Sequence, residues 1–154
     1  MIYTPPKVIQ YLLVAGGQAV LGVPTTGQWR VYAHSKDPNG PQIITVIQTG
    51  GIIEGKDLRN GRVSEHFGIQ LQFWATGNAE LASAKANQVA EYMTRTVRRT
   101  TVTVNSVLLT PPVSKDYRVH SISQIGSVIP LGQEENEKRF GCSVNFTATI
   151  EELP

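Results

Sequence analysis

Histidine, cysteine and acidic side chains are the groups of this chain that could do chemistry, and their spacing gives little support for it. The three histidines are His34, His66 and His120. None of them stands at the short spacing of a zinc site from another histidine or from the single cysteine, although a site built from distant residues stays open. The phosphate-binding patterns GxxxxGK[ST] and GxGxxG are absent from the sequence. We therefore expect no cofactor and no metal.

The cysteine and the one acidic cluster are better explained by structure than by catalysis. Cys142 lies among the apolar positions of a strand-like segment, which favours a buried thiol over a nucleophile. Glu134, Glu135 and Glu137 crowd a segment that is typical of a solvated hairpin connection. An acid–base pair instead needs two environments that push the pKa values of its carboxyl groups apart. We predict that the protein is not an enzyme.

The most distinctive segment is a charged, glycine-containing loop from Gly50 to His66, with no helical or strand pattern of its own. Loops beyond about 12–15 residues tend to be functional or disordered. Its three acidic and three basic residues balance: Glu54, Lys56, Asp57, Arg59, Arg62 and Glu65. A balanced loop suits a complementary protein surface better than DNA, because phosphate binding scales with the number of cations. We predict a protein interface here; a solvated surface loop is the alternative.

Composition indicates one domain over residues 1–154, with many of its surface residues in contacts. The 154 residues are 40% hydrophobic and only 17% charged, against about 25% charged in an average soluble domain. The net charge of +2 is small for a dedicated nucleic-acid binder. No apolar run approaches the roughly 20 residues of a membrane-spanning helix, and no secretory signal pattern opens the chain. We expect no membrane contact and synthesis in a reducing cytoplasm.

The hydrophobic periodicity predicts an α+β fold: an antiparallel β-sheet with two helices packed on one face and a long loop inserted between strands. The first helix follows Thr4 and ends at Gly16-Gly17, and the second begins at the N-cap Asn78 and carries an apolar stripe to Val97. The expected strands are residues 29–34 and 43–49, joined as a hairpin, then 66–76, 101–109, 116–125 with a bulge near Ser121, and 140–150.

Alternation along the strands predicts one core and a second, polar face. The expected core residues are Phe67, Ile69, Leu71, Phe73, Met93, Phe140, Val144 and Phe146. Residues 43–47 are apolar on both faces, so this strand is either central in the sheet or covered by a neighbouring subunit. The polar face carries neutral amides, which suit a wet interface. The candidate residues of a secondary interface are Ile43, Val46, Gln70, Gln72, Glu134 and Glu135.

One segment carries a family resemblance. From Gln48 to Ala75 the sequence is QTGGIIEGKDLRNGRVSEHFGIQLQFWA. Its Gly-Gly pair, Glu-Gly pair, charged run, Arg-x-x-Glu-His-x-Gly motif and alternating glutamine-rich strand resemble the tail terminator (tail completion, minor capsid) proteins of long-tailed bacteriophages. With the order of the later elements, the resemblance covers roughly two thirds of the chain. The chain departs from the family pattern at Phe67, where a proline is frequent, and at Phe73-Trp74, where an arginine often ends the strand.

The resemblance implies a structural protein of the virion tail or neck, made in the host cytoplasm. It implies a ring of this chain, typically six copies, that caps the tail tube and ends its growth. The implied partners are further copies of the chain, the tail tube protein and the head–tail connector or stopper protein, with DNA only as passing cargo in the lumen. The alternative is another neck or head-completion protein built from similar parts. A small enzyme is a further alternative, for which the sequence offers no cluster of converging polar residues.

Overall fold

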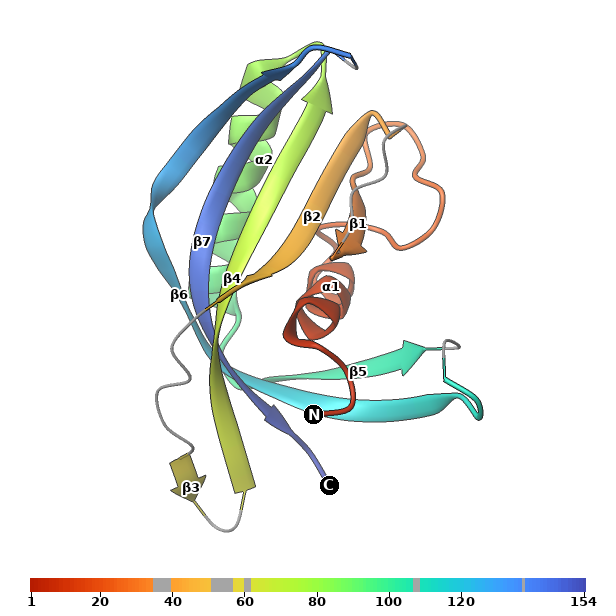
Figure 1. The fold of residues 1–154 in the computed structure, drawn as a ribbon, viewed down its shortest axis with the longest axis vertical. Helices are drawn as coiled ribbons and strands as arrows, with labels where there is room; N and C mark the ends of the chain where they lie inside the picture. The colour runs from red at the N-terminus through yellow and green to blue at the C-terminus, as the bar shows by residue number, and fades with distance from the viewer. Residues whose placement is uncertain (35–39, 51–56, 60–61, 107–108, 137) are drawn as a thin grey trace.

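A computed structural model describes residues 1–34, 40–50, 57–59, 62–106, 109–136 and 138–154. Helix α1 spans Pro5–Ala15, and α2 spans Ala79–Glu91 and continues as one π-helical turn, η1, over Tyr92–Thr96. The strands are β1 (Arg30–Ala33), β2 (Gln42–Thr49), β3 (Asp57–Arg59), β4 (Arg62–Thr76), β5 (Thr100–Ser106), β6 (Val113–Glu134) and β7 (Arg139–Glu152). They form one sheet in the order β1-β2-β4-β7-β6-β5, with β3 beside β4 (Figure 1).

The sheet confirms the α+β class but is mixed, not wholly antiparallel. Strand β1 pairs with β2 in parallel, with Arg30 opposite Ile43 and Ala33 opposite Val46, whereas every other pair of strands is antiparallel. The predicted hairpin between these two segments is therefore wrong. Turn residues indicate that the chain changes direction, but they do not fix how the next strand pairs. Because the two strands are parallel, they start side by side at Arg30 and Ile43.

Both helices form where the sequence predicts them, by different local means. Asn78 caps α2, because its side-chain Oδ1 accepts hydrogen bonds from the backbone N–H groups of Glu80 (2.9 Å) and Leu81 (3.3 Å). Thr4 precedes α1 in an extended conformation, but its hydroxyl makes no capping bond and instead lies 2.7 Å from Nε2 of His34. Helix α1 ends at Gly16, where a Cβ atom would collide with the ring of Tyr92.

One core fills the space between the sheet and the helices. The predicted residues of β4, β7 and η1 belong to it, and they are fully or almost fully buried: Phe67, Ile69, Leu71, Phe73, Met93, Val144 and Phe146. The stripe along α2 is buried as well, which confirms its predicted orientation. Phe140 is the exception, because it lies at the start of β7, is half-buried and lines a surface hollow. Figure 1 shows α2 behind β4 and β7, on the covered side of the sheet.

Two strands are longer than the sequence pattern indicates. Strand β4 begins at Arg62, and Asp57–Arg59 pairs with it as β3, so part of the predicted loop over residues 50–66 is a small antiparallel pair. Strand β6 runs on to Glu134, so most of the predicted solvated link over residues 126–139 is strand. The irregularity predicted near Ser121 is present as a register shift between Val119 and Ser121. There β6 changes course, and its first part forms a two-stranded wing with β5 (Figure 1).

Candidate functional site

The predicted loop interface is described only in part. Glu54 and Lys56 lie outside the described residues. The backbone positions of Asp57, Arg59 and Arg62 belong to β3 and β4, with Asp57 opposite Ser64 and Arg59 directly opposite Arg62. Glu65 is half-buried in β4, opposite Ile150 of β7. Four of the six predicted interface residues, Asp57, Arg59, Arg62 and Glu65, therefore belong to paired strands and not to an irregular loop.

The second predicted interface lies on the face of the sheet opposite the core. We use the term outer face for the surface formed by seven side chains: Thr45, Ile47, Gln70, Gln72, Ser143, Asn145 and Thr147. Strand register places them in rows across β2, β4 and β7, with Thr45, Gln72 and Ser143 in one row and Ile47, Gln70 and Asn145 in the next. In Figure 1 this side of β2, β4 and β7 faces the viewer.

Hydrogen bonds between amides organise the middle of the outer face. Gln72 donates through Nε2 to Oε1 of Gln70 (3.0 Å), and Gln70 donates through Nε2 to Oδ1 of Asn145 (3.2 Å). All three side chains are half-buried. A chain of amides in fixed positions, with carboxamide donors and acceptors still reaching water, can hydrogen-bond to a protein surface without the cost of desolvating a charge.

Charged groups flank the outer face instead of crossing it. At one end, Arg139 is 1% exposed and donates to Oε2 of Glu134 through Nε (3.1 Å) and Nη2 (2.9 Å). Its Nη1 also donates to the carbonyl of Gly40 (3.1 Å). Glu134 thus neutralises a buried arginine, while Glu135 is exposed in the turn that follows. Sequence reasoning missed Arg139, because an arginine before a strand gives no sign of burial.

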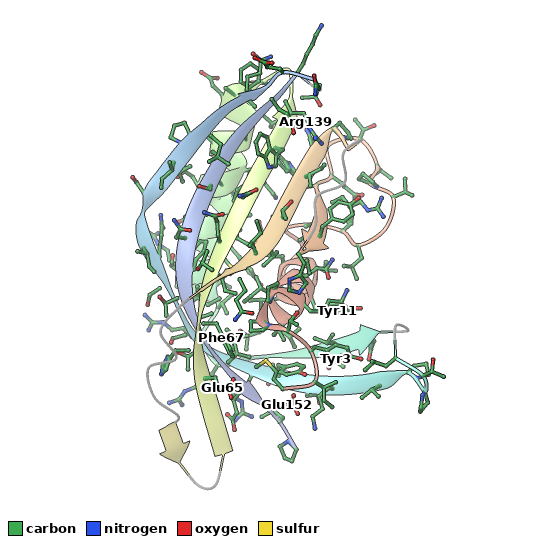
Figure 2. All side chains as sticks on the ribbon, in the orientation of Figure 1. Tyr3, Tyr11, Glu65, Phe67, Arg139 and Glu152 are labelled. Atoms are coloured by element: carbon green, nitrogen blue, oxygen red, sulfur yellow. The ribbon has the colours of Figure 1, made fainter. Side chains whose placement is uncertain are left out.

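Histidine and glutamate mark the other end of the outer face. Nδ1 of His66 lies 2.8 Å from the hydroxyl of Thr149, and Nε2 of His120 lies 2.7 Å from Oε2 of Glu151, which is 4% exposed. Nearby, Tyr117 donates to Oε2 of Glu152 (3.0 Å) and accepts from the backbone N–H of Tyr3 (2.9 Å). Burial, together with the neighbouring Glu152 carboxylate, raises the pKa of Tyr117 to about 12. Tyr117 thereby links Tyr3, near one end of the chain, to Glu152, near the other. Figure 2 shows Tyr3 and Glu152 in the same region of the molecule.

Two residues of the predicted secondary interface are not available to a partner. Val46 is fully buried in the core, and Ile43 is fully buried on the other side of β2, beside Gly40 and opposite Trp74. Both are covered within the single chain, because β2 lies inside the sheet between β1 and β4. The central-strand explanation of the doubly apolar segment is therefore the right one.

No arrangement typical of catalysis is found in the part of the chain that the structure describes. Burial raises the pKa of the Cys142 thiol to about 11, so it is protonated and unreactive at neutral pH. Within the described ranges, no three histidine, cysteine or acidic residues gather as a metal site would require. Nor does any described helix have the length and apolar character needed to cross a bilayer.

Of two surface hollows that described residues line, neither collects paired titratable groups. One, of about 450 Å³, lies between the start of α2, the end of β6 and the start of β7, over Phe140. The other, of about 340 Å³, lies near Trp29 and Lys85, where partial burial lowers the pKa of the lysine. A hollow with one carboxylate, Glu80, or one amine offers no acid–base pair.

No model of a known protein family matches this chain, and no curated protein matches it either.

Proposed function

We propose that this chain is a non-enzymatic structural protein of a phage virion. Six copies form a ring that caps the tail tube, ends tube growth and joins the tail to the head connector. The support from sequence is the resemblance between Gln48 and Ala75. The element order that accompanies the resemblance is a strand, a long helix, a short strand and two further strands, and the structure has β4, α2, β5, β6 and β7 in that order.

The observation that carries the proposal is the uncharged outer face. Monomeric proteins commonly place charged side chains on the exposed side of an antiparallel sheet, whereas interface centres are depleted in charge. The seven outer-face residues include no lysine, arginine, aspartate or glutamate. Thr45 and Ser143 are 2% exposed, so the part of this face that a partner can reach is formed by Ile47, Gln70, Gln72, Asn145 and Thr147. A neutral, hydrogen-bonding face forms contacts with a copy of itself or with another ring at little desolvation cost.

Ring closure also needs a head-to-tail contact, in which two different patches of the same chain meet. Such a contact gives a closed ring when the rotation from one copy to the next is a whole fraction of 360°, and otherwise it gives a filament. We assign the outer face to one side of this head-to-tail contact, where it meets a different surface of the next copy. We assign the charged segment, the charged residues between Glu54 and Glu65, to the docking of the tube or the connector.

The proposal is tested by the native mass of the purified chain together with electron micrographs of negatively stained particles. We expect closed rings that attach to the ends of purified tail tubes. The double variant Gln70→Lys, Gln72→Lys places two cations on the outer face and should give folded monomers. The control Asn87→Lys adds a cation at an exposed position of α2, and it should still form rings.

The outcomes separate the candidate functions. Rings that bind DNA-filled heads but not tail tubes would show the alternative, a neck or head-completion protein. A wild-type chain that stays monomeric at high concentration and binds neither tubes nor heads would contradict the proposal. Rings that form equally well from the double variant would leave the function standing and remove the outer face from the contact.

A further inference from the structure

The second half of β6 is an open edge of the sheet. Strand β5 pairs only with residues 113–119 of β6, whereas β7 pairs with β6 along its other side as far as Glu134. Among the described residues, no strand lies beside residues 121–134 on the β5 side. Figure 1 shows this part of β6 as the free margin of the sheet, next to β7. Such an edge presents unpaired backbone N–H and C=O groups to any extended chain.

The open edge lacks the charges that usually protect such strands. Natural edge strands carry lysines or other charges that prevent pairing with foreign chains. From Ser121 to Gln133 the sequence is SISQIGSVIPLGQ, without a single charged residue. Three large apolar side chains of this stretch are exposed: Ile125 at 54%, Ile129 at 49% and Leu131 at 42%. An uncharged, partly apolar edge is chemically suited to a strand that is itself uncharged.

Register shifts divide the edge into two parts. Residues 121–125 are a regular run, because each of them is paired in sequence with β7 from Thr149 to Asn145. Shifts follow between Ile125 and Ile129 and between Pro130 and Gly132. Proline has no N–H to donate, and Gln124 already donates to the carbonyl of Gly126 (3.0 Å). Backbone pairing with an added strand is therefore expected along the regular run.

The second part of the edge borders the hollow over Phe140. Pro130 and Gly132 of β6 form one wall of this hollow, and Ala79 and Ser83 of α2 form the opposite wall. Its volume of about 450 Å³ has room for one large apolar side chain. On its other side, β7 spans the stretch from Ile125 to Gly132 with only the four steps from Asn145 to Gly141, because of the register shifts. A strand that pairs with residues 121–125 therefore reaches this hollow after roughly three to four more residues.

We propose that the β6 edge from Ser121 to Gln133 is a β-augmentation site. Its occupant is an extended, uncharged segment of another protein, about nine residues long, with apolar side chains at alternate positions. In this mode of recognition, backbone hydrogen bonds supply affinity and pockets for alternate side chains supply specificity. Outer-face side chains of the added strand contact Ile125 and Ile129, and one side chain on the opposite side enters the hollow over Phe140. Ile125 pairs with Asn145 and Ile129 with Ser143, so these two side chains border the outer face. The backbone of the edge and the hollow over Phe140 are not part of the outer face that the ring proposal uses.

The test uses a synthetic peptide of the stated chemistry. Residues Phe140–Thr149 of the chain itself already pair with the other side of β6, and they are uncharged and apolar at alternate positions. A dye-labelled peptide of this sequence, with serine in place of Cys142 and with blocked ends, should bind the intact protein saturably in a fluorescence polarisation titration. A control peptide with the same side chains, N-methylated on its central amides, should bind roughly tenfold more weakly or not at all.

Variants of the protein locate the binding site. Ile125→Lys with Ile129→Lys should weaken peptide binding roughly tenfold or more, whereas Val23→Lys should not change it, because Val23 is an exposed apolar residue elsewhere (86%). Ala79→Trp fills the hollow and should weaken binding of the peptide. This variant should still bind the N-methylated peptide more weakly than the unmodified peptide, because backbone pairing with residues 121–125 is retained. Melting temperatures close to that of the unmodified protein would show that all three proteins are folded.

Three results would overturn the assignment. The first is the absence of saturable binding, and the second is equal binding of the N-methylated peptide. The third is a homodimer or ring of the unmodified protein that excludes the peptide, because a second copy of the chain would then fill the edge. Absence of rings alone would contradict the proposed function and leave this peptide test intact.

Discussion

Replacing Phe146 by alanine should destabilise the fold far more than the same change at Phe140, on the same face of β7. Phe146 is 1% exposed and packed in the core between the sheet and the helices, whereas Phe140 is half-buried over a surface hollow. Removing a fully buried phenylalanine costs about 3–5 kcal/mol, from the lost transfer free energy and the cavity left behind. At Phe140 the ring is partly in water and adjoins an existing hollow, so we expect about 1–2 kcal/mol.

The assay is unfolding by urea and by heat, each followed by circular dichroism. Every variant is measured at the same protein concentration, because assembly adds to apparent stability. For a domain of this size each kcal/mol lowers the melting temperature by about 2–4 °C, so Phe146→Ala should lower it by roughly 6–20 °C. Equal losses for the two variants, or a loss below about 1 kcal/mol for Phe146→Ala, would refute the assignment of this strand face to the core.

Three further predictions concern a cap, a thiol and the charged segment. Asn78→Ala removes the acceptor of two N–H groups of α2 and should cost about 1 kcal/mol in the same urea assay, while Asn78→Asp should restore most of it. Cys142 should react with a thiol reagent only when the protein unfolds. Because its pKa is raised from 9.0 to about 11, the stability linked to the protonated thiol is fully present below pH 9 and is lost as the pH rises towards 11. Thermal unfolding at pH 8 and at pH 11 would detect this loss. The double variant Arg59→Glu, Arg62→Glu should leave the melting temperature nearly unchanged, because these two opposite positions carry like charges both before and after the change. The same variant should fail to dock to tail tubes. Normal docking would show that the segment is only a connector.

Sequence periodicity was sufficient for the parts of the fold in which burial alternates regularly. The α2 stripe and the core faces of β4 and β7 follow from spacing, because one side of each element must leave water. The parallel pairing of β1 with β2 could not be predicted. Turn residues in the connection are compatible with either direction, and the choice depends on contacts distant in sequence, such as the bond from the Gln10 amide to the carbonyl of Val31 (2.8 Å).

The candidate sites were also predictable only where burial alternates regularly along a strand, and not where it depends on contacts distant in sequence. Gln70 and Gln72 were assigned to the outer face correctly, since alternation fixes their side of β4. The open edge of β6 escaped notice, because an exposed strand with glycine, proline and serine has the composition of a loop. The buried pair of Arg139 with Glu134 was also missed, because its burial depends on the carbonyl of Gly40 from a remote segment.

Salt separates the two surfaces that the proposed ring would use. The Debye length falls from about 10 Å at 0.1 M to about 3 Å at 1 M ionic strength, so attraction between exposed charges is largely lost across that range. The outer face has no charged side chain among its seven residues, and a ring closed through it should keep nearly the same dissociation constant from low to high salt. Docking through the charged segment, which includes Asp57, Arg59 and Arg62, should weaken over the same range. Sedimentation of the rings and a count of capped tail tubes, both across a salt series, measure the two contacts independently. A ring that dissociates at 1 M salt while capping of tubes is unaffected would show that the two surfaces have been assigned the wrong way round.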